Sequence, residues 1–214
     1  MEVDVVKAFQ APMTDQTWVN KVVIGGLVNI VPIVNFIAIG YGLTYFAGLW
    51  NGKDVELPEW RDWGGLFVIG LKAFVIMLVY MIGVIIFGAL SMFMGGMLGG
   101  ILAFIIFLAV MFLLPIALLR FVQEGYSIAP AFAFQEIYAM ARAKMDEYML
   151  VYAIIVGLSL VLAAITRIPL LGWILGSFAF FYLSLCFYNL MIMVFSTEDE
   201  LEDMGTVDPG TKNG

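Results

Sequence analysis

Long runs of apolar residues, separated by short glycine-rich, proline-containing or charged segments, dominate this chain. The runs fall at about residues 17–31, 33–50, 64–90, 101–122, 149–166 and 170–195. A helix needs about 20 apolar residues to cross the hydrocarbon core of a bilayer, and several of these runs reach that length. The chain is 63% hydrophobic and 13% charged, with a mean hydropathy of +1.02. No water-soluble domain of this size could bury so much apolar surface, so we expect an all-α integral membrane protein.

The number of spans depends on the break at Pro32. Proline removes a backbone N–H and clashes with the preceding turn, so this break is either a kink in one long helix or a tight reversal between two. Short loops rich in lysine and arginine stay in the cytoplasm. With a cytoplasmic N-terminus, six spans leave only Arg167 outside, whereas merging the first two runs removes the bias. The basic residues that six spans place inside are Lys7, Lys21, Lys53, Arg61, Arg120, Arg142, Lys144 and Lys212. We predict six spans in the plasma (inner) membrane, with both termini cytoplasmic.

The six spans then form three helical hairpins. Their outer turns are expected at Pro32, at the glycine-rich residues 95–100 and at Pro169. Residues 1–195 are predicted to form a single transmembrane domain, because a chain of this length leaves no room for a second one. Residues 196–214 contain the acidic run EDELED and are predicted to be a disordered cytoplasmic tail. Acidic residues at positions 2 and 4 argue against a cleavable signal peptide.

The segment between the fourth and fifth spans, residues 127–149, is long enough to form a helix of its own. Its apolar residues recur at helical spacing, and its charged residues lie elsewhere around the helix. This pattern is typical of an amphipathic helix at a membrane surface, and we predict a cytoplasmic interfacial helix here. The residues expected on its apolar face are Phe134, Tyr138, Ala141, Met145 and Tyr148.

The loop that follows the second apolar run combines acidic residues with Trp60 and Trp63. Tryptophan is enriched at membrane interfaces, so we interpret this loop mainly as an anchor. The alternative is a cytoplasmic cation site formed by Glu56, Glu59 and Asp62. Clustered carboxylates without a defined ligand spacing are usually solvated, which favours the anchor.

A few polar residues lie within the predicted spans. Lys72 is about two turns inside the third span, and an ionisable residue at such a position is a candidate for an ion pathway. Its long stem could instead reach the cytoplasmic surface and pair with an acid there, either Asp62 or Glu124. Asn35 and Asn189 are further candidates for a polar pathway, although hydrogen bonding between helices would also explain them.

The chain contains few residues suited to catalysis. It has no histidine, and its one cysteine, Cys186, lies within an apolar run. No nucleophile motif, nucleotide loop, metal-ligand cluster or pair of intramembrane carboxylates is found, so we expect neither a catalytic residue nor a metal or cofactor. The net charge of −7 makes nucleic acid a poor partner.

Three function classes follow from these observations. The first is a non-enzymatic protein that organises membrane lipid or binds a membrane-protein partner, with self-association as one form of this. The second is a small channel or transporter that uses Lys72 and the two asparagines. The third is a lipid-modifying enzyme with an acidic site at Glu56, Glu59 or Glu124. We favour the first because every sizeable polar element is predicted on the cytoplasmic side.

Three segments resemble one known family. They are LPEWRDWGGLFVIGLKA at residues 57–73, WVNK at residues 18–21 and GYG at residues 40–42. Together they are similar to the domain of unknown function 4013 family of archaeal and bacterial membrane proteins, over roughly residues 5–195. The resemblance implies a polytopic prokaryotic membrane protein, and it brings no established reaction, ligand or catalytic residue. The acidic tail lies outside it.

Overall fold

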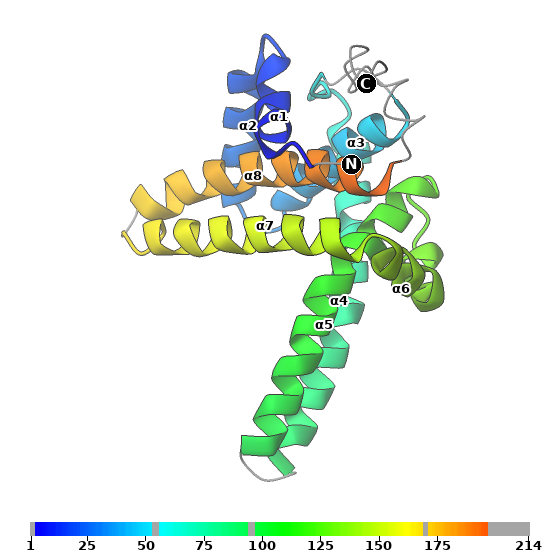
Figure 1. The fold of residues 1–214 in the computed structure, drawn as a ribbon. Coiled ribbons are helices and arrows are strands. Elements are labelled where there is room, and N and C mark those ends of the chain that lie inside the picture. Colours follow the sequence, from blue (N-terminus) through cyan, green and yellow to red (C-terminus); the bar gives the residue numbers. More distant parts are fainter. Residues whose placement is uncertain (1–2, 53–55, 94–96, 169–170, 197–214) are drawn as a thin grey trace. The chain divides into compact units, whose positions relative to one another are not determined.

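A computed structural model describes residues 3–52, 56–93, 97–168 and 171–196, and every regular element in these ranges is a helix (Figure 1). Two of the elements are short 3-10 helices, η1 and η2, and the others are α-helices. In chain order the elements are α1 (Val5–Gln10), η1 (Ala11–Thr14), α2 (Trp18–Ile30), α3 (Asn35–Trp50), α4 (Trp63–Phe93), α5 (Met97–Gln123), η2 (Ala129–Phe132), α6 (Phe134–Ala143), α7 (Met145–Ile165) and α8 (Leu171–Phe195).

Four of these helices are long and apolar enough to cross a membrane. The candidate spans are Trp63–Leu90, Gly99–Gln123, Met145–Ala164 and Gly172–Phe195. The two helices formed by the first two apolar runs are shorter, with 13 residues in α2 and 16 in α3. At 1.5 Å per residue they measure about 20 Å and about 24 Å, less than the roughly 30 Å of a bilayer core.

The chain breaks completely between α2 and α3. Ile33 has a φ of 73°, in the left-handed region that β-branched residues rarely enter. The two helices that flank this break contact each other. Pro32 therefore lies in a turn between two separate helices and does not kink a continuous one.

The described helices belong to two compact units. The first unit comprises Met1–Gly70 and Lys144–Gly214, and the second comprises Leu71–Ala143. The single domain predicted for residues 1–195 stays a prediction. The predicted turn at Pro169 and the acidic tail beyond residue 196 lie outside the described residues.

Helix α8 is the centre of the first unit, where it contacts α1, η1, α2, α3 and α7. Its crossing with α2 is close because α2 presents two adjacent glycines. A Cβ atom on Gly25 would overlap the ring of Phe181, and one on Gly26 would overlap the ring of Phe178. The Ser177 hydroxyl also donates a hydrogen bond to the Gly26 carbonyl (2.8 Å). Small residues thus allow the two helices to approach closely.

The start of α4 packs on α3 with the two backbones in contact. A Cβ atom on Gly40 would overlap the carbonyl of Leu66, and one on Gly70 would overlap the carbonyl of Phe36. Gly48, further along α3, faces open space. The two contacting glycines therefore fix how α3 and α4 pair within the first unit.

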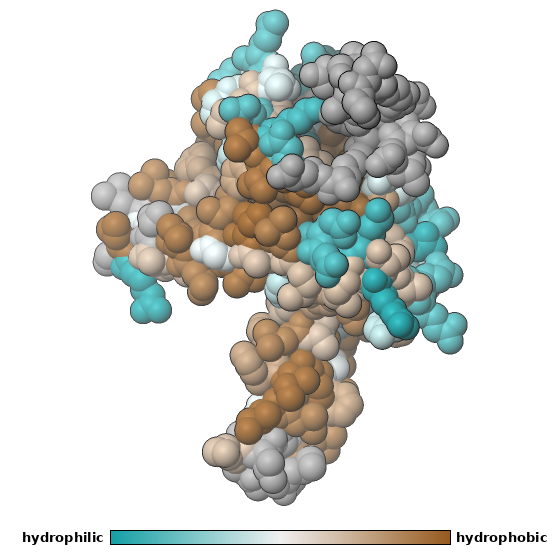
Figure 2. All heavy atoms as spheres, in the orientation of Figure 1, coloured by the Kyte–Doolittle hydropathy of each residue, from teal (hydrophilic) through white to brown (hydrophobic). Residues whose placement is uncertain are grey.

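The second unit holds η2 and α6 against the two long apolar helices α4 and α5. The Tyr80 hydroxyl of α4 donates to the Ala131 carbonyl of η2 (2.8 Å), and its ring stacks on Phe132. Arg120, near the end of α5, forms an ion pair with Glu136 of α6. Figure 2 shows apolar atoms covering α4 and α5, as expected of helices that face lipid.

The segment predicted as one amphipathic helix over residues 127–149 is divided. It consists of η2, α6 and the start of α7, and the break between α6 and α7 falls at Lys144. The predicted apolar face is divided as well. Ala141 and Tyr148 are buried, whereas Phe134, Tyr138 and Met145 are exposed. Placing all five residues on one continuous helix was therefore wrong, because α6 ends at Ala143 and a separate helix begins at Met145.

Candidate functional site

A buried lysine near the start of α2 organises an extensive polar contact in the first unit. The Lys21 ammonium lies 2.7 Å from each of three acceptors: an Asp15 carboxylate oxygen, the Leu57 carbonyl and a Glu59 carboxylate oxygen. Lys21 is only 6% exposed. An ammonium has three protons to donate, so its hydrogen-bonding capacity is fully used. We call Asp15, Lys21, Leu57 and Glu59 the Lys21 cluster.

Asp15 is the buried anion of this cluster. One carboxylate oxygen accepts hydrogen bonds from the backbone N–H (2.6 Å) and the hydroxyl (2.7 Å) of Thr17, and the other accepts from the Leu57 N–H (3.2 Å). Burial alone raises the pKa of Asp15, but the hydrogen bonds from Lys21 and Thr17 outweigh it and lower the pKa from 3.8 to about 2. Asp15 is therefore ionised at any physiological pH.

Aromatic rings fasten the same loop to α2 and α3. The Trp60 indole stacks on Tyr41, with ring centroids 3.9 Å apart and an interplanar angle of 14°. Its N–H donates to the Lys21 carbonyl (3.2 Å), and the Tyr41 hydroxyl donates to the Pro58 carbonyl (2.7 Å). Phe181 of α8 lies against both rings. Residues 57–60 are thus held by the contacts of Lys21 with Leu57 and Glu59, and by the stacking of Trp60 on Tyr41.

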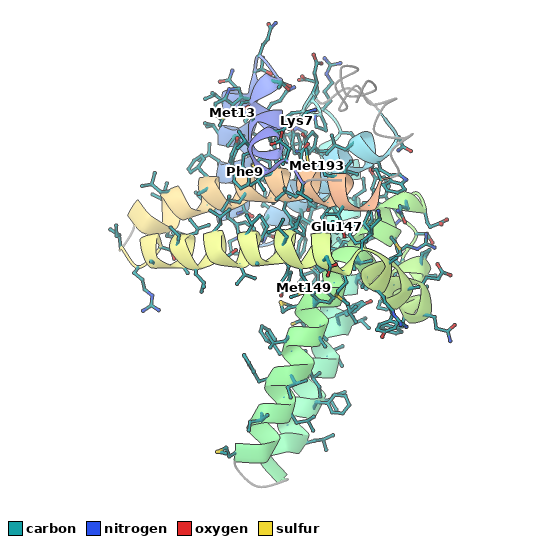
Figure 3. The ribbon with its side chains drawn as sticks, in the orientation of Figure 1. Lys7, Phe9, Met13, Glu147, Met149 and Met193 are labelled. Carbon is teal, nitrogen blue, oxygen red and sulfur yellow. The ribbon has the colours of Figure 1, made fainter. Side chains whose placement is uncertain are left out.

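The N-terminal part of the chain, from α1 to the beginning of α2, packs on the middle of α8. Figure 3 shows Phe9 of α1 lying over α8, and the Tyr182 hydroxyl donates a hydrogen bond to the Phe9 carbonyl (2.6 Å). The Tyr182 ring also contacts Trp18, the first residue of α2. These contacts hold α1 and the beginning of α2 beside the Lys21 cluster.

The three loop acids predicted as a cation site have different roles. Glu59 pairs with Lys21. Asp62 caps α4 by accepting a hydrogen bond from the Gly65 N–H (2.9 Å). Glu56 is exposed. Within the described parts of the chain, no group of three or more His, Cys, Asp or Glu residues could hold a metal ion.

The polar residues predicted within the spans occupy separate environments. Asn189 of α8 donates to the Tyr45 hydroxyl of α3 (2.9 Å) and to the Leu185 carbonyl (3.0 Å). Asn35 is the first residue of α3, and its side-chain oxygen is buried without a hydrogen-bond partner among the described residues.

Lys72 belongs to the second unit. Its ammonium donates to the Tyr126 carbonyl (3.2 Å), in the turn that follows α5. Of the two acids considered as its partners, Glu124 pairs with Arg120 and Asp62 caps α4.

Sequence reasoning treated Lys21 only as a topogenic charge and did not identify its cluster. A local signal was available, since Asp15 and Thr17 just before α2 are residues that favour a helix start. The partners Leu57 and Glu59 lie 36 and 38 residues further along the chain, and no spacing rule connects them to Lys21.

The described residues form a helical protein. Several of its helices are long, apolar and exposed, and are therefore suited to a membrane. Residues 24–171, well over half of the chain, match the model of a family described as "Protein of unknown function (DUF4013)". The chain belongs to this family. No curated protein and no solved structure matches it.

Proposed function

We propose that this chain is a non-enzymatic, multi-pass protein of the plasma (inner) membrane that organises lipid or binds a membrane-protein partner at its cytoplasmic face. The observation that carries the proposal is that charged residues are almost absent from the long apolar segments. No charged residue occurs between Lys72 and Arg120, and Arg167 is the only one between Glu147 and Glu198. Apart from Arg167, which lies between α7 and α8, the charged residues therefore lie before or near the start of α4 and α7 and near or after the end of α5 and α8.

The distribution of lysine and arginine supports a cytoplasmic location for the segments that carry these charges. The predicted topology has three hairpins, α2–α3, α4–α5 and α7–α8, that start from and return to the cytoplasmic side. Six full spans give this result, and so do four spans if α2–α3 returns without crossing. In either case both termini are cytoplasmic, and Arg167 lies at the outer turn.

Helix α6 is the element best suited to lie at the cytoplasmic interface. Ile137 and Ala141 are buried, whereas Phe134 and Tyr138 are 58% and 59% exposed on the adjacent face. Aromatic side chains at i and i+4 suit the boundary between headgroups and acyl chains. The ion pair with Arg120 attaches the start of the helix to α5.

A fluorophore scan tests this placement of α6. A bimane dye on a cysteine at position 138 should be quenched by brominated lipids in proteoliposomes. The same dye at Gln135, which is exposed on the same helix, should be quenched much less. Equal quenching at the two positions would contradict an interfacial α6.

Purification into native lipid nanodiscs tests the function itself. We expect either enrichment of one lipid class over the surrounding membrane, or a stoichiometric second membrane protein, or a discrete homo-oligomer. Mass spectrometry and native mass measurement would detect each of these. A monomer with bulk lipid composition and no bound protein would refute the proposal.

A small channel or transporter is the competing proposal, supported by the unpartnered buried oxygen of Asn35. Flux assays in liposomes would compare the wild type with Asn35→Ala and Lys72→Ala. Transport predicts a measurable flux of an ion or small solute that falls in at least one variant. Background flux in all three proteins would leave the non-enzymatic organising role as the better account.

A further inference from the structure

The length of the α2–α3 hairpin, measured from the Lys21 cluster, limits how deeply it can enter a membrane. Trp60 contacts both Lys21 and Tyr41, so these two residues mark the same level on the two helices. Val31 lies ten positions after Lys21, just beyond the end of α2, and Ile33 lies eight positions before Tyr41, just before α3 begins. At 1.5 Å per residue the turn lies about 12–15 Å beyond the cluster, which is half of a bilayer core of roughly 30 Å.

The cluster cannot move into the hydrocarbon to lengthen this reach. Glu59 has a side chain that is 58% exposed, and the neighbouring Arg61 and Asp62 are exposed as well. Transfer of Asp or Arg to the centre of a membrane is strongly unfavourable even on insertion scales. The level of Lys21 therefore stays among the headgroups.

The turn itself is suited to hydrocarbon. Val31, Ile33 and Val34 are exposed, Ile33 by 67%, and α2 continues this apolar surface toward its start through Leu27 and Val23. No charged residue occurs between Lys21 and Lys53. Exposed apolar side chains are favourable in hydrocarbon but not in water, so this turn is better suited to the membrane interior than to its surface.

Backbone groups around the turn are largely satisfied within the hairpin, as hydrocarbon requires. Val31 donates to Val28, Asn35 donates to Val31, and Phe36 donates to Ile33. Pro32 has no N–H to satisfy. The nearby Asn29 side chain donates to the Ser177 hydroxyl of α8 (3.4 Å), which in turn donates to the α2 backbone.

We propose that α2–α3 is a re-entrant hairpin, whose turn lies among the acyl chains of the cytoplasmic leaflet and does not reach the outer surface. The partner of this exposed apolar surface is lipid of one leaflet. The inference rests on the cytoplasmic placement of the Lys21 cluster under the proposed function. Beyond that function, the hairpin would displace lipid in the cytoplasmic leaflet and none in the outer leaflet.

Single-cysteine labelling in intact spheroplasts and inverted vesicles tests the proposal, in a Cys186→Ser background. Three exposed positions are compared: Ile33→Cys in the turn, Gln16→Cys before α2 and Arg167→Cys at the outer turn. With a membrane-impermeant maleimide, Arg167→Cys should react from outside and Gln16→Cys from inside. Ile33→Cys should react from neither side until detergent is added.

Reaction of Ile33→Cys from outside would overturn the re-entrant hairpin in favour of a full crossing. Reaction from inside would overturn it in favour of a hairpin outside the bilayer. If Gln16→Cys reacted from outside instead, the sidedness in the proposed function would fail, while protection at position 33 would still report a buried turn.

Nitroxide labels provide a second readout that does not depend on thiol reactivity. At positions 23, 27 and 31, the ratio of oxygen to nickel-chelate accessibility should rise steadily, because each step of four residues adds about 6 Å of depth. A ratio that peaked at position 27 and fell at position 31 would indicate that α2 passes the midplane, and it would overturn the proposal.

Discussion

Replacing Lys21 with methionine tests whether the Lys21 cluster stabilises the first unit. Methionine preserves most of the side-chain stem but removes the ammonium from its three acceptors. Glu59 is more than half exposed and regains water, so its pairing contributes only about 0–1 kcal/mol. Asp15 stays buried and charged, and loss of one partner from a buried ion pair costs about 3–5 kcal/mol. We expect K21M to lower the free energy of unfolding by about that amount.

Unfolding in mixed micelles with increasing SDS, followed by tryptophan fluorescence, measures this loss. Trp60 is a suitable reporter because it donates to the Lys21 carbonyl and stacks on Tyr41. Lys144→Met is the matched control at an exposed lysine, and it should stay within about 0.5 kcal/mol of the wild type. Adding Asp15→Asn to K21M should recover part of the loss, because the unpaired charge is then gone. Equal unfolding midpoints for K21M and K144M would refute the reasoning.

Three further outcomes follow from particular contacts. The folded pKa of Asp15 is about 2 against an ordinary value of 3.8, so its ionised form stabilises the fold above pH 3.8. That contribution, about 2 kcal/mol, should be lost as the pH falls toward 2 in the wild type but not in D15N, as measured by acid unfolding. Gly40→Ala should destabilise by about 1–3 kcal/mol because the new Cβ overlaps the Leu66 carbonyl, whereas Gly48→Ala, which faces open space, should not lower the thermal midpoint. Asn189→Leu should cost about 1–3 kcal/mol in the same assay by leaving a buried tyrosine hydroxyl unpaired; no change would show that this bond does not hold α8 to α3.

Helix positions could be predicted closely from the sequence because local composition determines them. The apolar run at about residues 17–31 became Trp18–Ile30, and the run at about 170–195 became Leu171–Phe195. In an apolar solvent every backbone group must be bonded within its own segment, so a long apolar run has few alternatives to a helix.

The depth of the first hairpin could not be predicted in the same way. Lysine and arginine report which side a loop lies on, and they give the same answer for a hairpin that crosses and for one that returns halfway. The distance from Lys21 to Val31 becomes informative only once Trp60 is known to place Lys21 and Tyr41 at one level.

The Lys21 cluster was missed for a related reason. Its members come from the segment just after η1, from α2 and from a loop beyond α3, and their meeting depends on the reversal at residues 31–34. Hydropathy patterns describe each segment separately and contain no information about such pairs.

The glycines of α2 and α3 have a consequence for how the chain is made. Gly25 and Gly26 are covered by Phe181 and Phe178, and Gly42 faces the ring of Tyr188. All three aromatic residues belong to α8, which the ribosome synthesises last among the described helices. The early helices are therefore synthesised with these contact surfaces uncovered, and the first unit can complete its packing only after most of α8 has been translated.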